Sequence, residues 1–441
     1  MKRYLLIFSL FFVQPINAQE VAPSPEIWSL EDCINYALEN NITVKDAVLN
    51  TDLAEVDYDR AKSARLPNLF GSASQTLTSG NSIDPITSDF VSEKINSNNL
   101  GINSSITLYQ GNQLNNQIEQ NKLLMEQSIF QEEVEKNNIA LNILETYLRA
   151  LYSKESITIA ENNLEASEKE VLRAKARLDA GTIALSDYTE AQSQAATNKF
   201  NVITAKNTYE QYIIDLKQLL ELSPTQEIEI QTLNKDLDLI NLELNKTAIY
   251  YKALQILPEV EVSDLSIAIN EKELDIAKGA YKPTLSLNGS VGTGYTSINY
   301  LSFSDQYNSN FNQRLGLTLT IPIFNRNQTK SAVKTAALNI EKAQIQKQNT
   351  EKVIYKNVET AYQNAVSAQE QLLAAKSSQE AAEQSYRLAQ KKYELEDLST
   401  TDLGISQNTY TNAQQNYLQA KYLNILYNQL LQFYQGNDIK L

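Results

Sequence analysis

Two aspartates with matching surroundings, Asp187 and Asp402, are the residues best placed to do chemistry in this sequence. Each is followed five residues later by a glutamine, Gln192 or Gln407. A carboxylate just ahead of a long apolar-periodic stretch can cap the N-terminus of a helix, and capping alone is an adequate explanation of both residues. Any further chemistry would need partner groups elsewhere in the chain.

The composition removes most of those partners. The chain has no His and a single Cys33, which excludes a Ser-His-Asp triad, a Cys-His pair, an imidazole metal ligand and an intrachain disulfide. No pair of acids suggests general acid-base catalysis, so we expect no catalytic residue, no metal and no cofactor. The 53 Asp and Glu against 38 Lys and Arg give a net charge of −15, which argues against nucleic acid as a partner.

The N-terminus predicts an export signal over residues 1–18. Lys2 and Arg3 precede an apolar run at 4–13, and Ile16-Asn17-Ala18 is a small-residue cleavage site before Gln19. A transmembrane anchor is the alternative, but the run is too short to cross a hydrocarbon core of ~30 Å.

The chain repeats itself once, at an offset of 215 or 216 residues. Ala61-Lys62-Ser63-Ala64 recurs at 277–280, and Asn112-Gln113 recurs as Asn327-Gln328. This predicts a duplicated half-chain. The predicted divisions are a first repeat at 19–223, with a β-hairpin at 66–110 and a helical hairpin at 112–222; a joining segment at 224–245; a second repeat at 246–436, with a β-hairpin at 284–324 and a helical hairpin at 327–435; and a tail at 437–441.

Long helices are predicted where Gly and Pro are missing, at 112–180 and 327–403. The first would form a rod of roughly 100 Å. Apolar residues follow heptad spacing, as in Ile157, Ala160 and Leu164, which indicates antiparallel coiled coils. An ordinary coiled-coil rod would explain the helices alone.

The stretches between the helices alternate with period two, which is typical of strands. Leu317, Leu319 and Ile321 are separated by polar or small residues, and three further segments show related patterns through Leu69, Leu100 and Leu285. Each strand should have about 10–13 residues, long enough to cross a bilayer when tilted. Polar loops at 80–97 and 296–310 should join the pairs, and a soluble meander is the alternative.

Four strands cannot close a membrane barrel, because open sheet edges are not tolerated in lipid. Three copies would supply about twelve strands. The predicted fold class is therefore an α+β membrane protein with a long antiparallel coiled-coil tunnel and four strands per protomer in a shared 12-stranded trimeric β-barrel.

The two turns between the long helices, at 178–188 (LDAGTIALSDY) and 393–403 (YELEDLSTTDL), carry the most specific resemblance. Over nearly the whole chain, the sequence resembles the TolC-like outer-membrane efflux proteins, the outer membrane factors. The resemblance implies a homotrimer in outer-membrane lipid with a helical tunnel in the periplasm. Such ducts passively conduct small molecules or secreted proteins delivered by a periplasmic adaptor and an inner-membrane pump of the RND, ABC or MFS type.

The resemblance also implies a gate at the helix tips. The family's tip tyrosine matches Tyr393, and its partners match Asp187 and Ser186, whereas the family's bracing arginine falls on Leu398. The first acidic ring of the closed aperture matches Asp402, where copies of one carboxylate would attract cations. The second ring falls on Ile405. The adaptor would contact the tips, at Gly181, Thr182, Leu185, Leu398, Ser399 and Thr400.

Two other classes of protein remain alternatives. A soluble periplasmic coiled-coil adaptor or scaffold would lack a lipid-facing sheet. A carboxylate-based hydrolase would need a concave pocket, which long rods do not provide.

Overall fold

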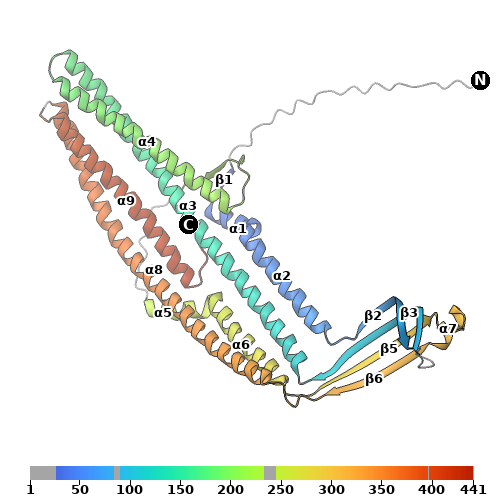
Figure 1. Cartoon of the computed structure of the whole chain (residues 1–441). Helices are drawn as coiled ribbons and strands as arrows, with labels where there is room; N and C mark the ends of the chain where they lie inside the picture. Colours follow the sequence, from blue (N-terminus) through green and yellow to red (C-terminus); the bar gives the residue numbers. More distant parts are fainter. Residues whose placement is uncertain (1–25, 84–89, 233–244, 396, 441) are drawn as a thin grey trace, which may run out of the picture.

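The computed structural model describes residues 26–83, 90–232, 245–395 and 397–440. The predicted signal peptide at 1–18 and most of the predicted joining segment at 224–245 lie outside these residues. Figure 1 shows an elongated molecule with strands at one end and helical hairpins extending to the other. Among the described helices, none is both long enough and apolar enough to cross a membrane.

The chain builds the same series of elements twice. In each half, two short helices lead to a strand pair, a helix of 67 residues and a returning helix of 35 residues. The first half contains α1 (Leu30–Asn40), α2 (Ile42–Ser63), β2 (Asn68–Ile83), β3 (Phe90–Gln110), α3 (Gln113–Asp179) and α4 (Leu185–Leu219). The second contains α5 (Lys246–Ile256), α6 (Pro258–Gly279), β5 (Thr284–Thr296), α7 (Phe303–Ser309), β6 (Asn312–Thr320), α8 (Gln328–Glu394) and α9 (Thr400–Tyr434).

The four long strands form one antiparallel sheet in the order β2-β3-β5-β6. The register places Ile102 beside Val291 and Leu287 beside Leu317, so apolar residues of neighbouring strands share one face. We call this the apolar face; it also carries Leu69, Leu100, Ile106, Leu285, Leu315 and Leu319. The opposite, polar face carries Asn103, Ser105, Ser286, Asn288, Ser290 and Thr318.

The predicted fold class is confirmed for the single chain, but two details were wrong. β2 and β3 have 16 and 21 residues, longer than predicted, and they occupy much of the segment predicted as a loop at 80–97. The polar hairpin continues beyond the apolar face because main-chain pairing between the two strands, as at Ser79 and Lys94, does not require apolar side chains. The second predicted loop, at 296–310, contains α7.

The core lies midway along the molecule, where α1 packs on α3. Here β1 (Glu26–Trp28) pairs in parallel with β4 (Ile228–Ile230). The buried Tyr147 hydroxyl lies 3.0 Å from the carbonyl oxygen of Trp28 and 3.1 Å from that of Gln231, so it ties both segments to α3. A second cluster, around Val358 and Leu431, joins α5, α6, α8 and α9.

Two glycines, Gly111 before α3 and Gly279 at the end of α6, lie against each other at the junction between the sheet and the helices. Gly111 has φ +58, and a Cβ built on it would lie 2.2 Å from the carbonyl oxygen of Gly279. A Cβ on Gly279 would lie 2.4 Å from Cγ of Gln113. Only glycine allows the two repeats to approach this closely.

Gly111→Ala should therefore lower the thermal midpoint of the detergent-solubilised protein. The left-handed backbone alone costs an alanine about 1–2 kcal/mol, and the contact with a main-chain carbonyl adds to this. Circular dichroism on heating measures the effect. Gly316→Ala is the matched control, because nothing lies within 4 Å of its Cβ position; equal midpoints for the two variants would contradict the close approach.

Candidate functional site

The candidate site is the far end of the helical hairpins, where α3 turns into α4 and α8 turns into α9. Figure 1 shows the two turns next to each other at the end opposite the sheet. Gly181 has φ +74, and the Thr182 N–H donates to the Arg177 carbonyl at 2.9 Å. In the second turn the Asp397 N–H donates to the Lys392 carbonyl, also at 2.9 Å. Glu396, the counterpart of Gly181, lies outside the described residues.

Asp187 and Asp402 support the starts of the returning helices, but neither is the N-cap. Ser399 is the N-cap of α9: its hydroxyl donates to Asp402 Oδ2 at 2.7 Å and accepts from the Asp402 N–H at 3.1 Å. In α4 the N-cap is Ala184, whose N–H donates to Asp187 Oδ2 at 3.3 Å. The alternative explanation, that these aspartates are the N-caps, is therefore wrong, because each lies three residues after the N-cap. Because alanine has no hydroxyl, the first repeat has neither of the two hydroxyl bonds of α9, and its aspartate accepts the main-chain N–H of the N-cap instead.

Tyr393 is buried between the two hairpins, with different contacts from those that the family pattern predicts. Its hydroxyl lies 3.4 Å from Thr400 Oγ1, and the Arg177 guanidinium stands 4.8 Å from the centre of its ring. Arg177 also donates to the Tyr393 carbonyl at 3.2 Å. Burial, with a smaller effect of the nearby Glu170 carboxylate, raises the pKa of Tyr393 and keeps its hydroxyl protonated.

We call Glu170, Arg173, Arg177, Tyr393 and Glu394 the tip cluster. It joins the first repeat to the second, because Arg173 also lies 3.6 Å from Glu394. Sequence reasoning missed its three members from α3. Their spacing of three and four residues, which puts them on one helix face, could have indicated the cluster. Ser186 lies outside it and accepts the Thr189 hydroxyl at its carbonyl oxygen, at 2.9 Å.

Asp402 and Ile405 are three residues apart and both exposed on one face of α9, whereas Leu403 is buried beneath them. Gly181, Thr182, Leu185 and Ser399 are exposed at the turns, and Leu398 and Thr400 are half-buried. The end of the hairpins therefore presents a carboxylate beside apolar side chains.

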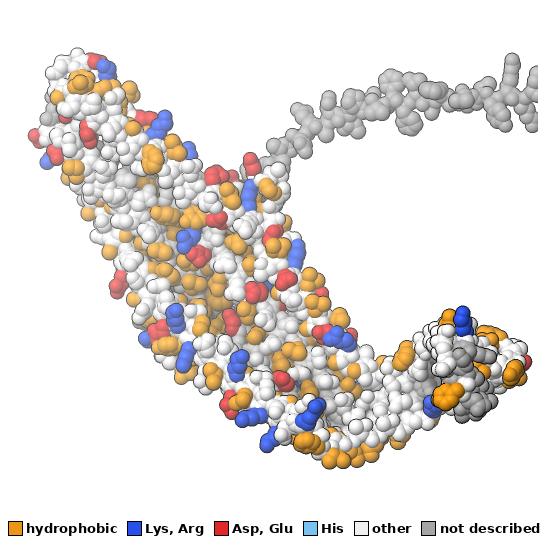
Figure 2. Space-filling model, viewed as in Figure 1, with side chains coloured by type: hydrophobic (Ala, Val, Ile, Leu, Met, Phe, Trp, Pro, Cys, Tyr) orange, Lys and Arg blue, Asp and Glu red, His pale blue; other side chains and the backbone are white. Residues whose placement is uncertain are grey.

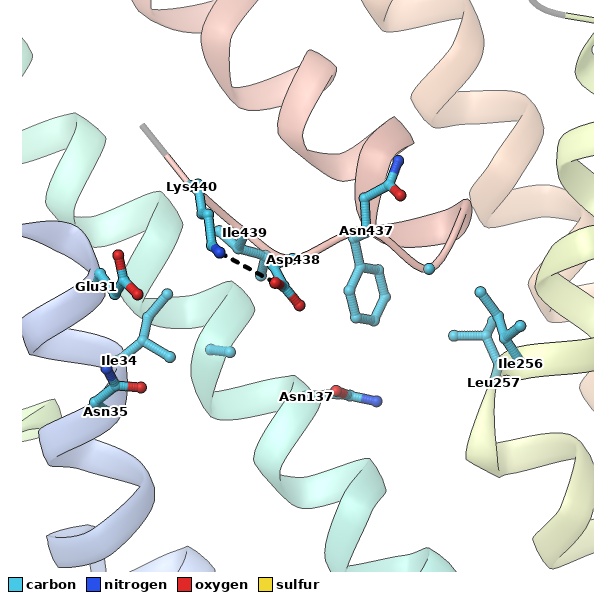
Figure 3. A pocket seen from close by; sticks show the side chains of 13 residues that line it. Glu31, Ile34, Asn35, Asn137, Ile256, Leu257, Asn437, Asp438, Ile439 and Lys440 are labelled. Carbon is cyan, nitrogen blue, oxygen red and sulfur yellow. Dashed lines mark ion pairs between the residues drawn. The ribbon is translucent and has the colours of Figure 1, made fainter.

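A cavity of about 590 Å³ lies midway along the molecule. In Figure 3 the ion-paired Asp438 and Lys440 of the C-terminal segment lie near Glu31 and Ile34 of α1, with Leu257 across from them. The Asp438–Lys440 distance is 3.2 Å, and both side chains are exposed. This cavity is lined by both polar and apolar residues, and its described lining includes no group of acids that could hold a metal.

The fold agrees with comparisons with known proteins. A model of the outer membrane efflux protein family matches residues 33–221 and 249–434, and the chain belongs to this family. Outer membrane protein TolC of Escherichia coli is 23% identical over 242 residues, which are 52% of this chain and 47% of TolC. The alignment thus spans about half the length of this curated relative.

Solved channel structures share the fold. The Campylobacter jejuni CmeC outer membrane channel superposes with a TM-score of 0.81 at 19% identity, over 93% of this chain and 86% of CmeC. The outer membrane protein VceC of Vibrio cholerae superposes with a TM-score of 0.79 at 14% identity, over 93% of this chain and 96% of VceC.

Replacing the Ser399 cap should loosen the start of α9. Ser399→Ala removes a bond to the Asp402 N–H, at a cost of about 1 kcal/mol, or roughly fivefold faster amide exchange in the first turn of α9. Hydrogen exchange with mass spectrometry measures this effect. Ser186→Ala is the control, because α4 uses its carbonyl rather than its hydroxyl; equal acceleration in both variants would contradict the assignment of the cap.

Proposed function

We propose that the chain is one protomer of an outer-membrane exit duct of a tripartite efflux or type I secretion system. The duct passively conducts small molecules or secreted substrates from a periplasmic adaptor and an inner-membrane pump to the outside. The pump would be of the RND, ABC or MFS type. The observation that carries the proposal is a sheet with one apolar and one polar face, whose strands continue into helices.

The sheet supports closure by copies of the same chain. β2 and β6 each have one neighbouring strand, so each leaves an edge of unpaired main-chain groups. Lipid offers no hydrogen bonds to such an edge. Two copies would supply about eight strands, a barrel whose interior side chains fill, whereas three would supply about twelve and leave room for a lumen lined by the polar face.

The helices support the same ring. Near the sheet, α3 packs between α2 and α6, and α6 packs against α8. Toward the tips, α3 packs against α4 and α9, and α9 packs against α8. The helices at the sides of this arrangement, α2, α4 and α8, carry exposed apolar side chains. These are Leu49, Leu53 and Val56 on α2, Phe200 and Ile203 on α4, and Leu338 and Ile345 on α8. Neighbouring protomers would cover them.

The tips would form the periplasmic gate. In a trimer, Asp402 and Ile405 would face the narrowest passage, with a ring of carboxylates beside a ring of apolar side chains. Tyr393, Asp187, Ser186 and Leu398 would set how the hairpins meet. The adaptor would dock on the turns, at Gly181, Thr182, Leu185, Leu398, Ser399 and Thr400. The tip cluster supports this proposal because it joins the two hairpins of one protomer.

The proposal predicts that the protein stays in the outer membrane through washes with high salt and urea. An integral barrel is released only when detergent replaces the lipid around its apolar face. Immunoblotting of the washed fractions against a soluble periplasmic marker measures this. Recovery of the chain with the soluble marker would favour the adaptor or scaffold alternative.

Asp402→Asn should weaken block of single-channel current by divalent cations. The amide oxygen can still accept the Ser399 hydroxyl, so the cap is kept while the charge is lost. Planar bilayers with cations on the tip side measure the change. Glu55→Gln on α2 is the control, since it removes one exposed charge far from the tips; the same block in both variants and the native protein would place Asp402 outside the passage.

A further inference from the structure

The segment at 297–311, between β5 and β6, is folded against the apolar face of the sheet. It contains α7, and three strand side chains that contact it, Thr293, Asn98 and Tyr295, lie on that face. Thr293 donates to the Tyr307 carbonyl at 2.7 Å, and the Tyr307 hydroxyl donates to Asn98 at 2.7 Å. The rings of Tyr295 and Phe303 lie 5.3 Å apart. Asn98 and Tyr295 pair across the sheet, which confirms that they share a face.

A buried glutamine holds this segment in place. Gln306 is fully buried, and the two hydrogens of its Nε2 are shared among the carbonyl oxygens of Thr296, Asn299 and Leu301, at 3.1, 3.3 and 3.0 Å. Its Oε1 accepts the Thr296 N–H at 2.9 Å. A side chain that satisfies this many main-chain groups fixes the loop in one shape.

The fixed loop displays apolar side chains outward. Tyr300 is fully exposed, and Leu301, Phe303 and Phe311 are each about half exposed. We call these four the aromatic patch. Asp305 is the only charged residue at 297–311, and its carboxylate accepts the Ser302 hydroxyl at 2.6 Å. Figure 2 shows hydrophobic side chains on this end of the molecule among few charged ones.

The aromatic patch lies where the apolar face becomes mostly polar, with Leu77 as the apolar residue of the row beyond. Moving along the sheet away from the helices, the rows of the apolar face contain Leu, Ile and Val up to Leu100. The next row contains Gln75, Asn98 and Tyr295. This change from aliphatic to amide and phenol side chains is typical of the boundary between hydrocarbon and headgroups.

We propose that the segment at 297–311 is a lipid-surface anchor that seats the aromatic patch in the headgroup region of the outer leaflet. The inference rests on the proposed function, because it needs the apolar face to contact lipid. Continuity of the patch with that face favours lipid as the occupant. The loop lies on the side of the sheet opposite the polar face, so it does not cover the lumen. Tyrosine and phenylalanine suit this position because their rings pack on acyl chains while the phenol reaches water.

Site-directed spin labelling in proteoliposomes tests the anchor. Tyr300→Cys places a nitroxide in the patch, and the native thiol does not interfere, because Cys33 is buried and burial raises its pKa to about 12. The collision rate of each label is measured with oxygen, which partitions into lipid, and with a water-soluble nickel complex. Thr76→Cys on the polar face is the control for the lumen, and Leu317→Cys on the apolar face is the control for lipid.

The anchor predicts an oxygen-to-nickel ratio at position 300 several-fold above that at position 76 and below that at position 317. A ratio at 300 equal to that at 76, with position 317 still in lipid, would overturn the anchor alone and leave the patch facing water or a protein partner. Low ratios at both 300 and 317 would instead overturn the proposed membrane barrel. If Gln306 fixes the loop, Gln306→Ala should make the label at position 300 more mobile, which its spectral line shape measures.

Discussion

The two unpaired edges of the sheet, on β2 and β6, impose the constraint on which the architecture depends. Main-chain N–H and C=O groups in hydrocarbon need partners, and a single chain cannot supply them at these edges. The same constraint applies to the helices, because two residues separate β3 from α3 and seven separate β6 from α8. If copies of the chain close the sheet into a ring, the helices that follow the strands form a ring as well. Gly111 and Gly279 allow the two repeats to approach closely at this junction.

Duplication provides two hairpins of matching length, yet their tips differ in chemistry. The first turn has Gly181 and an alanine N-cap, whereas the second has the reciprocal bonds of Ser399 and Asp402. The tip cluster then connects the hairpins through Arg177 and Tyr393. Where the family pattern places an arginine, at Leu398, this chain has none, and Arg177 brings a guanidinium to Tyr393 from the other repeat. The proposed gate thus keeps a cation beside its tyrosine through a different residue.

Local patterns predicted the parts of the fold that local forces decide. Missing Gly and Pro marked the two helices of 67 residues, and period-two alternation marked the strands through Leu100 and Leu317. The pairing of β1 with β4 was missed because it joins segments about two hundred residues apart. The helix α7 was missed because its sequence is polar apart from the aromatic residues, and Gln306 stabilises it through tertiary bonds. The tip cluster was missed for the same reason: its contacts cross between repeats.

The mass of the detergent-solubilised protein tests the central claim, that copies of this chain close the sheet. Light scattering combined with absorbance and refractive index separates the protein mass from that of the bound detergent. The account predicts a single particle of three mature chains. A stable, elongated particle of one chain would contradict it, because the edges of β2 and β6 would then be satisfied without any partner.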